Sequence, residues 1–148
     1  MDQIWKLDTL SCAEAFISNQ DGQSLLSLKN YIGGQFQENP SQCAFISAYN
    51  PKTGREYAKV PVSDATAVQS AVDAAKAAFP SWAKSSRRQR SHHLQRIASL
   101  LQENRELFAV WESIDQGKTL ERARVEIDRA VSNFQFVVPT CLCSQADD

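Results

Sequence analysis

This sequence contains few of the residues that mark disulfide-stapled or glycine-rich proteins. Its 148 residues include four cysteines, five glycines and one methionine. Of the cysteines, only Cys141 and Cys143 lie close together, so a disulfide scaffold is not expected and reduced thiols in the cytosol are the default. The glycine-rich phosphate loops G-x-G-x-x-G and G-x-x-x-x-G-K-[ST] do not occur in the sequence either.

The sequence also lacks an excess of charge of one sign and a long apolar run. Sixteen basic residues are balanced by seventeen acidic residues, so no global field attracts nucleic acid or an anionic membrane. No stretch approaches the roughly 20 apolar residues of a membrane-spanning helix, and residues 1–28 show neither an export nor an organelle signal. We therefore expect a soluble, cytoplasmic protein with no nucleic-acid or membrane partner.

Short strands are predicted in the first half of the chain. Gly33-Gly34 supplies the positive φ angles of a tight hairpin turn, and Pro51 and Gly54 favour a second turn. We expect two antiparallel hairpins that form one small sheet with one buried face; their strands are residues 31–32, 35–36, 45–49 and 55–60. Residues 1–29 form only a weakly patterned extension.

Three or four amphipathic helices are predicted between residues 63 and 138. Ser63 is placed to cap the first helix and Ser85 or Ser86 the second. Pro80 is expected to end the first helix and to leave Trp82 in the connection, and Gly117 suits the left-handed residue past a helix end. The residues after Val138 are predicted to be a frayed tail.

Apolar residues recur at spacings of three and four in each of these helices. We expect the resulting stripes to pack on each other and on the strands. Their members are Ala65, Val68, Ala71, Val72, Ala75 and Phe79; Leu94, Ile97, Ala98 and Leu101; Leu107, Phe108, Trp111 and Ile114; and Leu120, Ala123, Ile127, Ala130, Val131, Phe134 and Val138. The fold class is therefore α+β, with residues 30–138 as its body and 139–148 as a tail.

Few residues suggest chemistry, and each has a simpler explanation. Cys141-x-Cys143 has no second ligand pair for zinc, and His92 and His93 point about 100° apart on a helix, so they do not share a metal. Gln116-Gly117-Lys118-Thr119 is interpreted as a helix cap. We therefore assign no catalytic, cofactor-binding or metal-ligating residue.

A single basic concentration comprises Arg87, Arg88, Arg90 and Arg96 together with both histidines. It lacks the interleaved aromatic residues of a nucleic-acid interface, so a solvated helix face with ion pairs is the favoured interpretation. Binding of phosphates by this patch is the remaining alternative.

Several short segments, in this order and spacing, resemble the amino-terminal part of the aldehyde dehydrogenase superfamily. They are Asn30 to Phe36, Tyr49 to Gly54, Val68 to Trp82, Arg90 with Leu94 and Ile97 to Leu101, and Glu112 to Thr119. Ala78 to Trp82, Asp115 to Leu120 and Ala130 to Phe134 look most like the 2-aminomuconate semialdehyde dehydrogenase branch, although Asp128 stands where that branch suggests proline. The resemblance implies the opening part of that family's α/β cofactor domain.

The resemblance implies oxidation of an aldehyde or semialdehyde with NAD(P), in the setting of tryptophan catabolism. In the family a cysteine thiolate attacks the aldehyde, and a glutamate activates the water that releases the acid. These parts lie further along a longer chain and map onto no residue here. We therefore expect a truncated member that is inactive alone. The alternative is a stand-alone helical interaction module that associates with full-length aldehyde dehydrogenase subunits.

Overall fold

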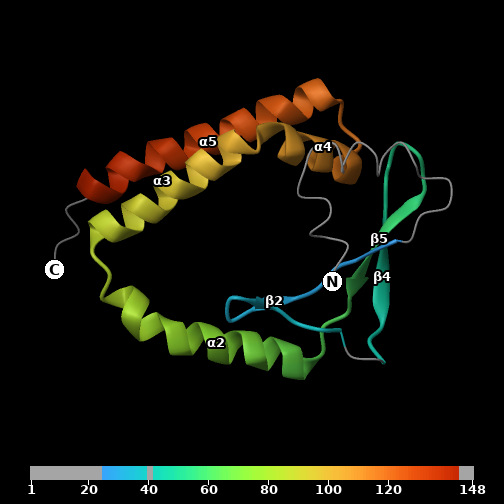
Figure 1. Cartoon of the computed structure of the whole chain (residues 1–148), viewed down its shortest axis with the longest axis horizontal. Coiled ribbons are helices and arrows are strands. Elements are labelled where there is room, and N and C mark those ends of the chain that lie inside the picture. The colour runs from blue at the N-terminus through green and yellow to red at the C-terminus, as the bar shows by residue number, and fades with distance from the viewer. Residues whose placement is uncertain (1–24, 40–41, 144–148) are drawn as a thin grey trace.

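The computed structural model describes residues 25–39 and 42–143, with the backbone alone for residues 140–143. Short strands come first and long helices follow, which confirms the α+β prediction. The strands are β1 (Leu26–Ser27), β2 (Tyr31–Ile32), β3 (Gln35–Phe36), β4 (Phe45–Tyr49) and β5 (Glu56–Pro61). The helices are α2 (Ala65–Ala83), α3 (Arg87–Glu103), α4 (Arg105–Gln116) and α5 (Leu120–Cys143). Figure 1 shows α2 on one side of an open space and α3 and α5 on the other.

Both predicted hairpins are present. Gly33 and Gly34 have φ angles of 63° and 81° in the turn between β2 and β3, as a tight two-residue turn requires. Strands β4 and β5 pair antiparallel from Phe45 opposite Pro61 to Tyr49 opposite Glu56, with one irregularity after Ala48. Local turn residues therefore determine these two pairings.

The prediction of a single four-stranded sheet with one buried face is wrong. Strands β2 and β3 form a sheet of their own, while β1 joins β5 in parallel, with Leu26 opposite Ala58. The successive residues Tyr57 and Ala58 are both buried, although neighbouring residues in a strand point to opposite faces. Strand β1 has only two residues and lies inside the segment predicted as an extension. It is too short for the alternation of apolar and polar residues that marks a strand in the sequence. Residues 1–24 lie outside the described part of the chain.

The helix starts are partly as predicted. Ser86 caps α3 in a capping box with Gln89, whereas the cap of α2 is Asp64, whose Oδ1 accepts a hydrogen bond from the Ala67 N–H at 2.8 Å. The prediction of Ser63 as this cap is wrong because its Oγ instead accepts a hydrogen bond from Asn30 Nδ2 at 2.8 Å. A partner 33 residues away in the sequence thus decides the cap.

Two prolines lie inside helices instead of ending them. Helix α2 continues through Pro80 and includes Trp82, and α5 continues through Pro139 to Cys143. Each proline removes one main-chain hydrogen bond, but α2 goes on to Ala83 and α5 to Cys143. The predictions of a helix end at Pro80 and of an unstructured segment directly after Val138 are therefore wrong. The predicted left-handed end at Gly117 is confirmed by its φ of 70°.

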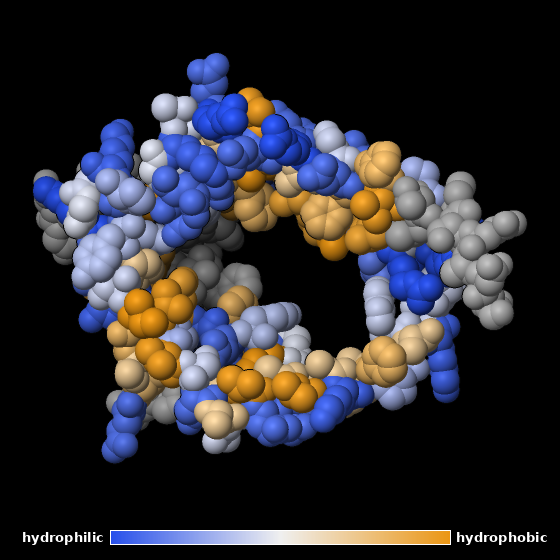
Figure 2. Space-filling model, turned by 180° about the vertical axis from the view of Figure 1, so that it is seen from behind, coloured by the Kyte–Doolittle hydropathy of each residue, from blue (hydrophilic) through white to orange (hydrophobic). Residues whose placement is uncertain are grey.

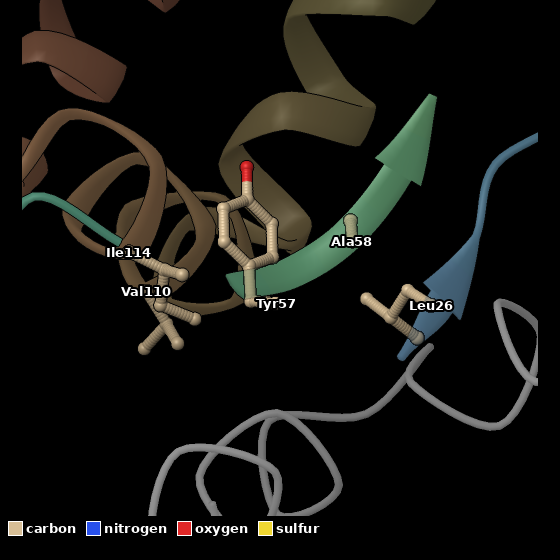
Figure 3. Close-up of a cluster of buried hydrophobic side chains, with 5 residues drawn as sticks. All are labelled: Leu26, Tyr57, Ala58, Val110 and Ile114. Atoms are coloured by element: carbon tan, nitrogen blue, oxygen red, sulfur yellow. The ribbon is translucent and has the colours of Figure 1, made fainter. Parts of the chain in front are cut away.

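The principal core connects the three-stranded sheet to α4. Tyr57 and Ala58 of β5 lie between Leu26 of β1 and the residues Val110 and Ile114 of α4, as Figure 3 shows. Partly buried residues surround this cluster, namely Leu28, Ala48, Leu107, Trp111 and Leu120. Because the cluster joins segments more than 50 residues apart, it brings the strands and the last helices together.

Helix α5 packs along α3 and α4. Every member of its predicted stripe is buried or partly buried, which confirms the stripe. Small and medium residues make the helix contacts, since Ala98, Ala109, Ala123 and Val131 are at most 4% exposed. In α4, however, Phe108 is 41% exposed, and Ala109 and Val110 take the buried positions that the spacing alone did not indicate.

The predicted packing of the α2 stripe is wrong. No residue of α2 is buried, and Val68 and Phe79 are 55% and 65% exposed. Another face of the helix approaches the β2–β3 hairpin instead. A Cβ built on Gly33, in the turn of that hairpin, would lie 3.9 Å from the Ala74 side chain. Figure 2 shows apolar side chains along α2 beside the open space. Periodicity identifies such a face but not what covers it.

Ion pairs also hold α4 to α5. Arg105 donates to both carboxylate oxygens of Asp128 at 2.6 and 2.7 Å, and Arg124 donates to Glu106 at 2.8 and 2.9 Å. A further bond from Arg105 to Glu106 at 2.7 Å connects the two pairs. The hydrogen bond from Arg105 lowers the pKa of Asp128, and that from Arg124 lowers the pKa of Glu106.

We expect Phe134→Asp to unfold the chain and Phe79→Asp to leave its thermal midpoint nearly unchanged. Truncating a buried phenylalanine costs about 3–5 kcal/mol, much of the stability of a small domain, and a buried charge adds to this cost. Phe134 is partly buried on α5, whereas Phe79 is exposed on α2. Thermal unfolding followed by circular dichroism measures both. A soluble Phe134→Asp variant with an unchanged midpoint would show that the α5 stripe is not core.

We expect Asp128→Asn to lower the thermal midpoint near pH 7 and to lower it less near pH 3. A carboxylate with a lowered pKa stabilises the fold above its unfolded pKa, about 3.9 for Asp, and this contribution is lost as the pH falls through the folded pKa. Asp73→Asn serves as the control, because Asp73 is an exposed carboxylate on α2 that accepts from Gln69. An equal difference at both pH values would contradict the role of the Arg105 pair.

Candidate functional site

A hollow of about 720 Å³ lies beside the β2–β3 hairpin and the start of α2. The segment between β3 and β4 forms its other side. Its lining is rich in amides and hydroxyls, and includes Asn30, Gln37, Asn39, Gln42, Ser63, Thr66 and Ser70. Apolar atoms still contribute most of its exposed surface, so these groups offer single hydrogen bonds on a largely apolar wall.

Many of these polar groups already hold the chain in place. Asn39 Nδ2 donates to the Leu28 carbonyl at 2.8 Å, and Asn30 Nδ2 donates to Ser63 Oγ at 2.8 Å. The Cys43 thiol donates to the Ala44 carbonyl at 3.2 Å. Part of the hollow's polar lining is therefore explained by hydrogen bonds that hold the chain in place, such as the one from Asn30, before the hairpin, to Ser63, before α2.

The hollow holds no pair of groups suited to nucleophilic catalysis. Cys43 lines it, but its other lining residues include no histidine, lysine or arginine to favour a thiolate. Its two carboxylates have structural partners, since Asp64 caps α2 and Glu38 pairs with Lys29 at 2.6 Å. The arrangement can bind a polar group but has no base for acyl or hydride chemistry.

The candidate histidines belong to no group of metal ligands among the described residues. His92 and His93 are exposed on α3 with ring centroids 6.1 Å apart, and His93 lies 5.8 Å from the Trp82 ring. Among the residues that the structure describes, no group of three or more His, Cys, Asp and Glu side chains is arranged for a metal. The side chains of Cys141 and Cys143 lie outside that part.

The contacts of the arginine patch on α3 include one ion pair and one bond to the main chain. Arg96 pairs with Glu103 at 3.3 Å, as the interpretation of a solvated ion-paired face predicts. Arg90 instead donates to the Ser85 carbonyl at 3.0 Å and so holds the connection before the helix. An open hollow of about 440 Å³ lies at the start of α3, lined by Ser86, Arg88, Gln89, His92 and His93.

The residues described here do not fit the pyrophosphate of a dinucleotide. A helix N-terminus after a glycine-rich loop would be required, but Gly33-Gly34 joins two strands. Carboxylates of Asp64, Glu106 and Glu121 lie at the starts of α2, α4 and α5, where they would repel phosphate. At the start of α3, the capping box already occupies two of the free backbone N–H groups, those of Ser86 and Gln89.

The Gln116-Gly117-Lys118-Thr119 segment ends one helix and starts the next, as predicted. Lys118 Nζ donates to Glu112 at 2.7 Å and also to Glu126, and these two hydrogen bonds raise its pKa. Thr119 Oγ1 accepts from the Arg122 N–H at 3.3 Å. The lysine thus stabilises the α4–α5 connection and is not available as a phosphate ligand.

One polar contact of the core escaped the sequence analysis. The Tyr57 hydroxyl donates to Asp115 Oδ1 at 2.6 Å, and burial together with this bond raises the pKa of Tyr57 to about 12. The two residues are 58 positions apart, so no local spacing indicates the contact. It ties β5 to the end of α4, next to the segment that carries part of the family resemblance.

The comparison with known sequences confirms that resemblance. The sequence model of the Aldehyde dehydrogenase family matches residues 37–146. The chain is 44% identical over 129 residues to the 2-aminomuconic semialdehyde dehydrogenase of Bos taurus, covering 83% of this chain and 26% of that protein. The human protein of the same name is 43% identical over 130 residues, covering 84% and 26%. The malonate-semialdehyde dehydrogenase of Pseudomonas aeruginosa is 34% identical over 110 residues, covering 74% and 22%.

Solved structures show the same fold over the same part. An NAD-dependent benzaldehyde dehydrogenase from Corynebacterium glutamicum is 30% identical, with a TM-score of 0.71 that covers 78% of this chain and 25% of that chain. The lactaldehyde dehydrogenase of Escherichia coli is 23% identical and supports the fold alone, with a TM-score of 0.76 over 84% of this chain and 27% of that chain.

The chain thus spans about a quarter of the length of the curated relatives that it matches. Within the described residues, none of the helices has both the length and the apolar composition to cross a bilayer. The match begins directly after β3 and covers strands β4 and β5 and helices α2 to α5. With more than half of its residues matched by the family model and the corresponding fold in place, the chain belongs to the aldehyde dehydrogenase family.

Proposed function

We propose that this chain contributes the amino-terminal part of an NAD-dependent dehydrogenase that oxidises 2-aminomuconate semialdehyde, or a closely related semialdehyde, to the carboxylate. The observation that carries the proposal is the 44% identity to the bovine 2-aminomuconic semialdehyde dehydrogenase, compared with 34% to the malonate-semialdehyde enzyme. Tryptophan catabolism is the corresponding setting. The cytoplasmic location expected from the sequence stays a prediction.

We further propose that the 148-residue chain does not oxidise aldehydes by itself. The hollow beside α2 has no base near Cys43, and the four helix starts are unsuited to a dinucleotide. Hydride transfer to NAD would need both a nucleophile and a cofactor site. In this proposal the described residues supply the scaffold on which such a site is assembled, and none of them is a catalytic residue.

The alternative is a helical module that binds a partner and takes no part in oxidation. One observation favours it as well, because the apolar stripe of α2 is exposed. The two functions differ in what this chain does within a whole dehydrogenase. A scaffold can replace the corresponding part of an active relative, whereas an unrelated binding module cannot.

The isolated chain is expected to produce no NADH above background when it is incubated with NAD and an aldehyde. The physical reason is the lack of a nucleophile–base pair and of a dinucleotide site in the described residues. Absorbance of NADH measures the rate, with the full-length bovine enzyme as the positive control. Steady turnover that scales with the concentration of the 148-residue chain would refute this proposal.

A chimera is expected to keep the activity of the bovine enzyme when residues 37–143 of this chain replace the matched segment. We expect the chimera's kcat/KM for the semialdehyde to lie within about tenfold of the parent's value. Tenfold corresponds to a change of only about 1.4 kcal/mol in the activation free energy. The control chimera takes the same segment from the Pseudomonas malonate-semialdehyde enzyme. A well-folded chimera without aldehyde oxidation, or one that has lost the semialdehyde preference of the parent, would contradict the proposed function.

A further inference from the structure

Strand β4 is an open edge of the three-stranded sheet. The strand order is β1-β5-β4, so β4 is paired on one side only in the part of the chain that the structure describes. Figure 1 shows it beside β5 at one end of the molecule. Its apolar side chains are exposed as well, since Phe45 is 39% exposed, Ile46 62% and Tyr49 58%. An exposed apolar edge strand is a template on which another strand can pair.

Hydrogen bonds at both ends of β4 show which main-chain groups face β5. The Ala44 carbonyl accepts from the Val62 N–H at 2.8 Å, and the Asn50 N–H donates to the Arg55 carbonyl at 2.9 Å. Bonding directions alternate along an antiparallel strand, so the even-numbered residues from 44 to 50 point their main-chain groups toward β5. The one irregularity of this pair adds its extra residue to β5 and leaves the alternation of β4 intact.

The N–H and carbonyl groups of Phe45, Ser47 and Tyr49 therefore point to the free edge. The position of Phe45 agrees with this assignment, because it lies opposite Pro61, which has no N–H to donate. Among the described residues, no hydrogen bond between segments uses the main-chain groups of these three residues. The edge thus offers three donors and three acceptors at a spacing of two residues.

Strand β4 lacks the short length and the charges that protect an edge. The opposite edge is protected, since β1 has only two residues and the carbonyl of the following Leu28 accepts from Asn39 Nδ2 at 2.8 Å. Strand β4 has five residues, and residues 42–50 include no charged side chain. The free edge of β4 is therefore open to another strand without burial of a charge.

A second copy of β4 fits this edge in one antiparallel register. A two-fold axis at Ser47 places Ser47 opposite its own copy and Phe45 opposite Tyr49 of the second copy. Each of the three outward residues then belongs to a hydrogen-bonded pair, which exchanges two N–H···O bonds. A shift by two residues leaves one of the three outside the pairing. The register also brings Phe45 and Tyr49 together on one face as cross-strand aromatic pairs, which stabilise sheets.

The charges of the neighbouring strand do not oppose this pairing. Lys59 of β5 lies opposite Ser47, so the axis at Ser47 relates two Lys59 side chains. They are three strand spacings apart, about 14 Å, which exceeds the screening length of about 10 Å at 0.1 M salt. A two-fold pairing therefore meets no like charges at its centre.

We propose that two copies of this chain associate by antiparallel pairing of their β4 strands about a two-fold axis at Ser47. The two three-stranded sheets then form one continuous sheet. Two-fold dimers with the same patch on both subunits are the commonest oligomers. Because each copy contributes one strand of five residues, the interface is small and the dimer dissociates on dilution. The proposal does not depend on the proposed function.

Self-association and its location are measured on the 148-residue chain. Sedimentation velocity over a dilution series up to about 1 mM measures the dimer Kd, and amide hydrogen exchange followed by NMR locates the contact. We expect exchange at the N–H groups of Phe45, Ser47 and Tyr49 to slow with concentration. The N–H groups of Ile46 and Ala48 face β5 and serve as the internal control.

Charges at Ser47 test the register. Ser47→Lys places two like charges opposite each other at the axis, and we expect it to raise the dimer Kd at least about tenfold. An equal mixture of Ser47→Lys and Ser47→Glu places opposite charges there, and we expect it to associate at least about tenfold more tightly than Ser47→Lys alone. Ser132→Lys, at an exposed position of α5, is the control that leaves the dimer unchanged. Thermal unfolding checks that each variant folds.

The possible outcomes are separable. A chain that stays monomeric throughout the series, or a mixture that associates no more tightly than Ser47→Lys alone, overturns the proposal. A dimer that Ser47→Lys leaves intact and Phe79→Asp dissociates uses the exposed stripe of α2 instead, and the proposal is then wrong. If Ser47→Lys does not fold, unchanged exchange at the three outward N–H groups of the unaltered chain still overturns it. None of these results bears on the proposed function, which the activity of the chimera tests.

Discussion

The contact between β5 and α4 is the interaction on which the rest of the structure depends. Tyr57 and Ala58 meet Val110 and Ile114, and the Tyr57 hydroxyl donates to Asp115 at the end of the same helix. Because the strands precede all of the helices along the chain, this contact closes a loop of more than 50 residues. Burial of the apolar side chains stabilises the contact, and the hydrogen bond between Tyr57 and Asp115 makes the pairing of β5 with α4 specific.

That closure also explains why α2 is isolated. The helix lies within the closed loop, tied to the β2–β3 hairpin at its start and joined to α3 at its end, while α3, α4 and α5 pack among themselves. Ion pairs from Arg105 and Arg124 strengthen the α4–α5 side. The described chain therefore has one packed side, formed by α3, α4 and α5, and one side, along α2, whose apolar residues are exposed.

This division is consistent with a scaffold and not with a reaction centre. The described residues use their charged and polar groups to cap helices, to pair α4 with α5 and to hold the hairpin. Cys43 has no base beside it, and the α4–α5 connection uses Lys118 as an ion-pair partner. Membership of the aldehyde dehydrogenase family follows from the match of sequence and fold.

The sequence by itself determined the local features of this protein. Gly33-Gly34 specified a hairpin turn, Gly117 a left-handed helix end, and the stripe of α5 a buried face, because φ preferences and helical periodicity act over a few residues. Tertiary structure alone decided that β1 pairs with β5, that Asp64 and not Ser63 caps α2, that α2 continues through Pro80, and that its stripe stays exposed. These outcomes depend on partners up to 33 positions away or on the absence of one among the described residues, and no local pattern encodes which distant surface a residue will meet.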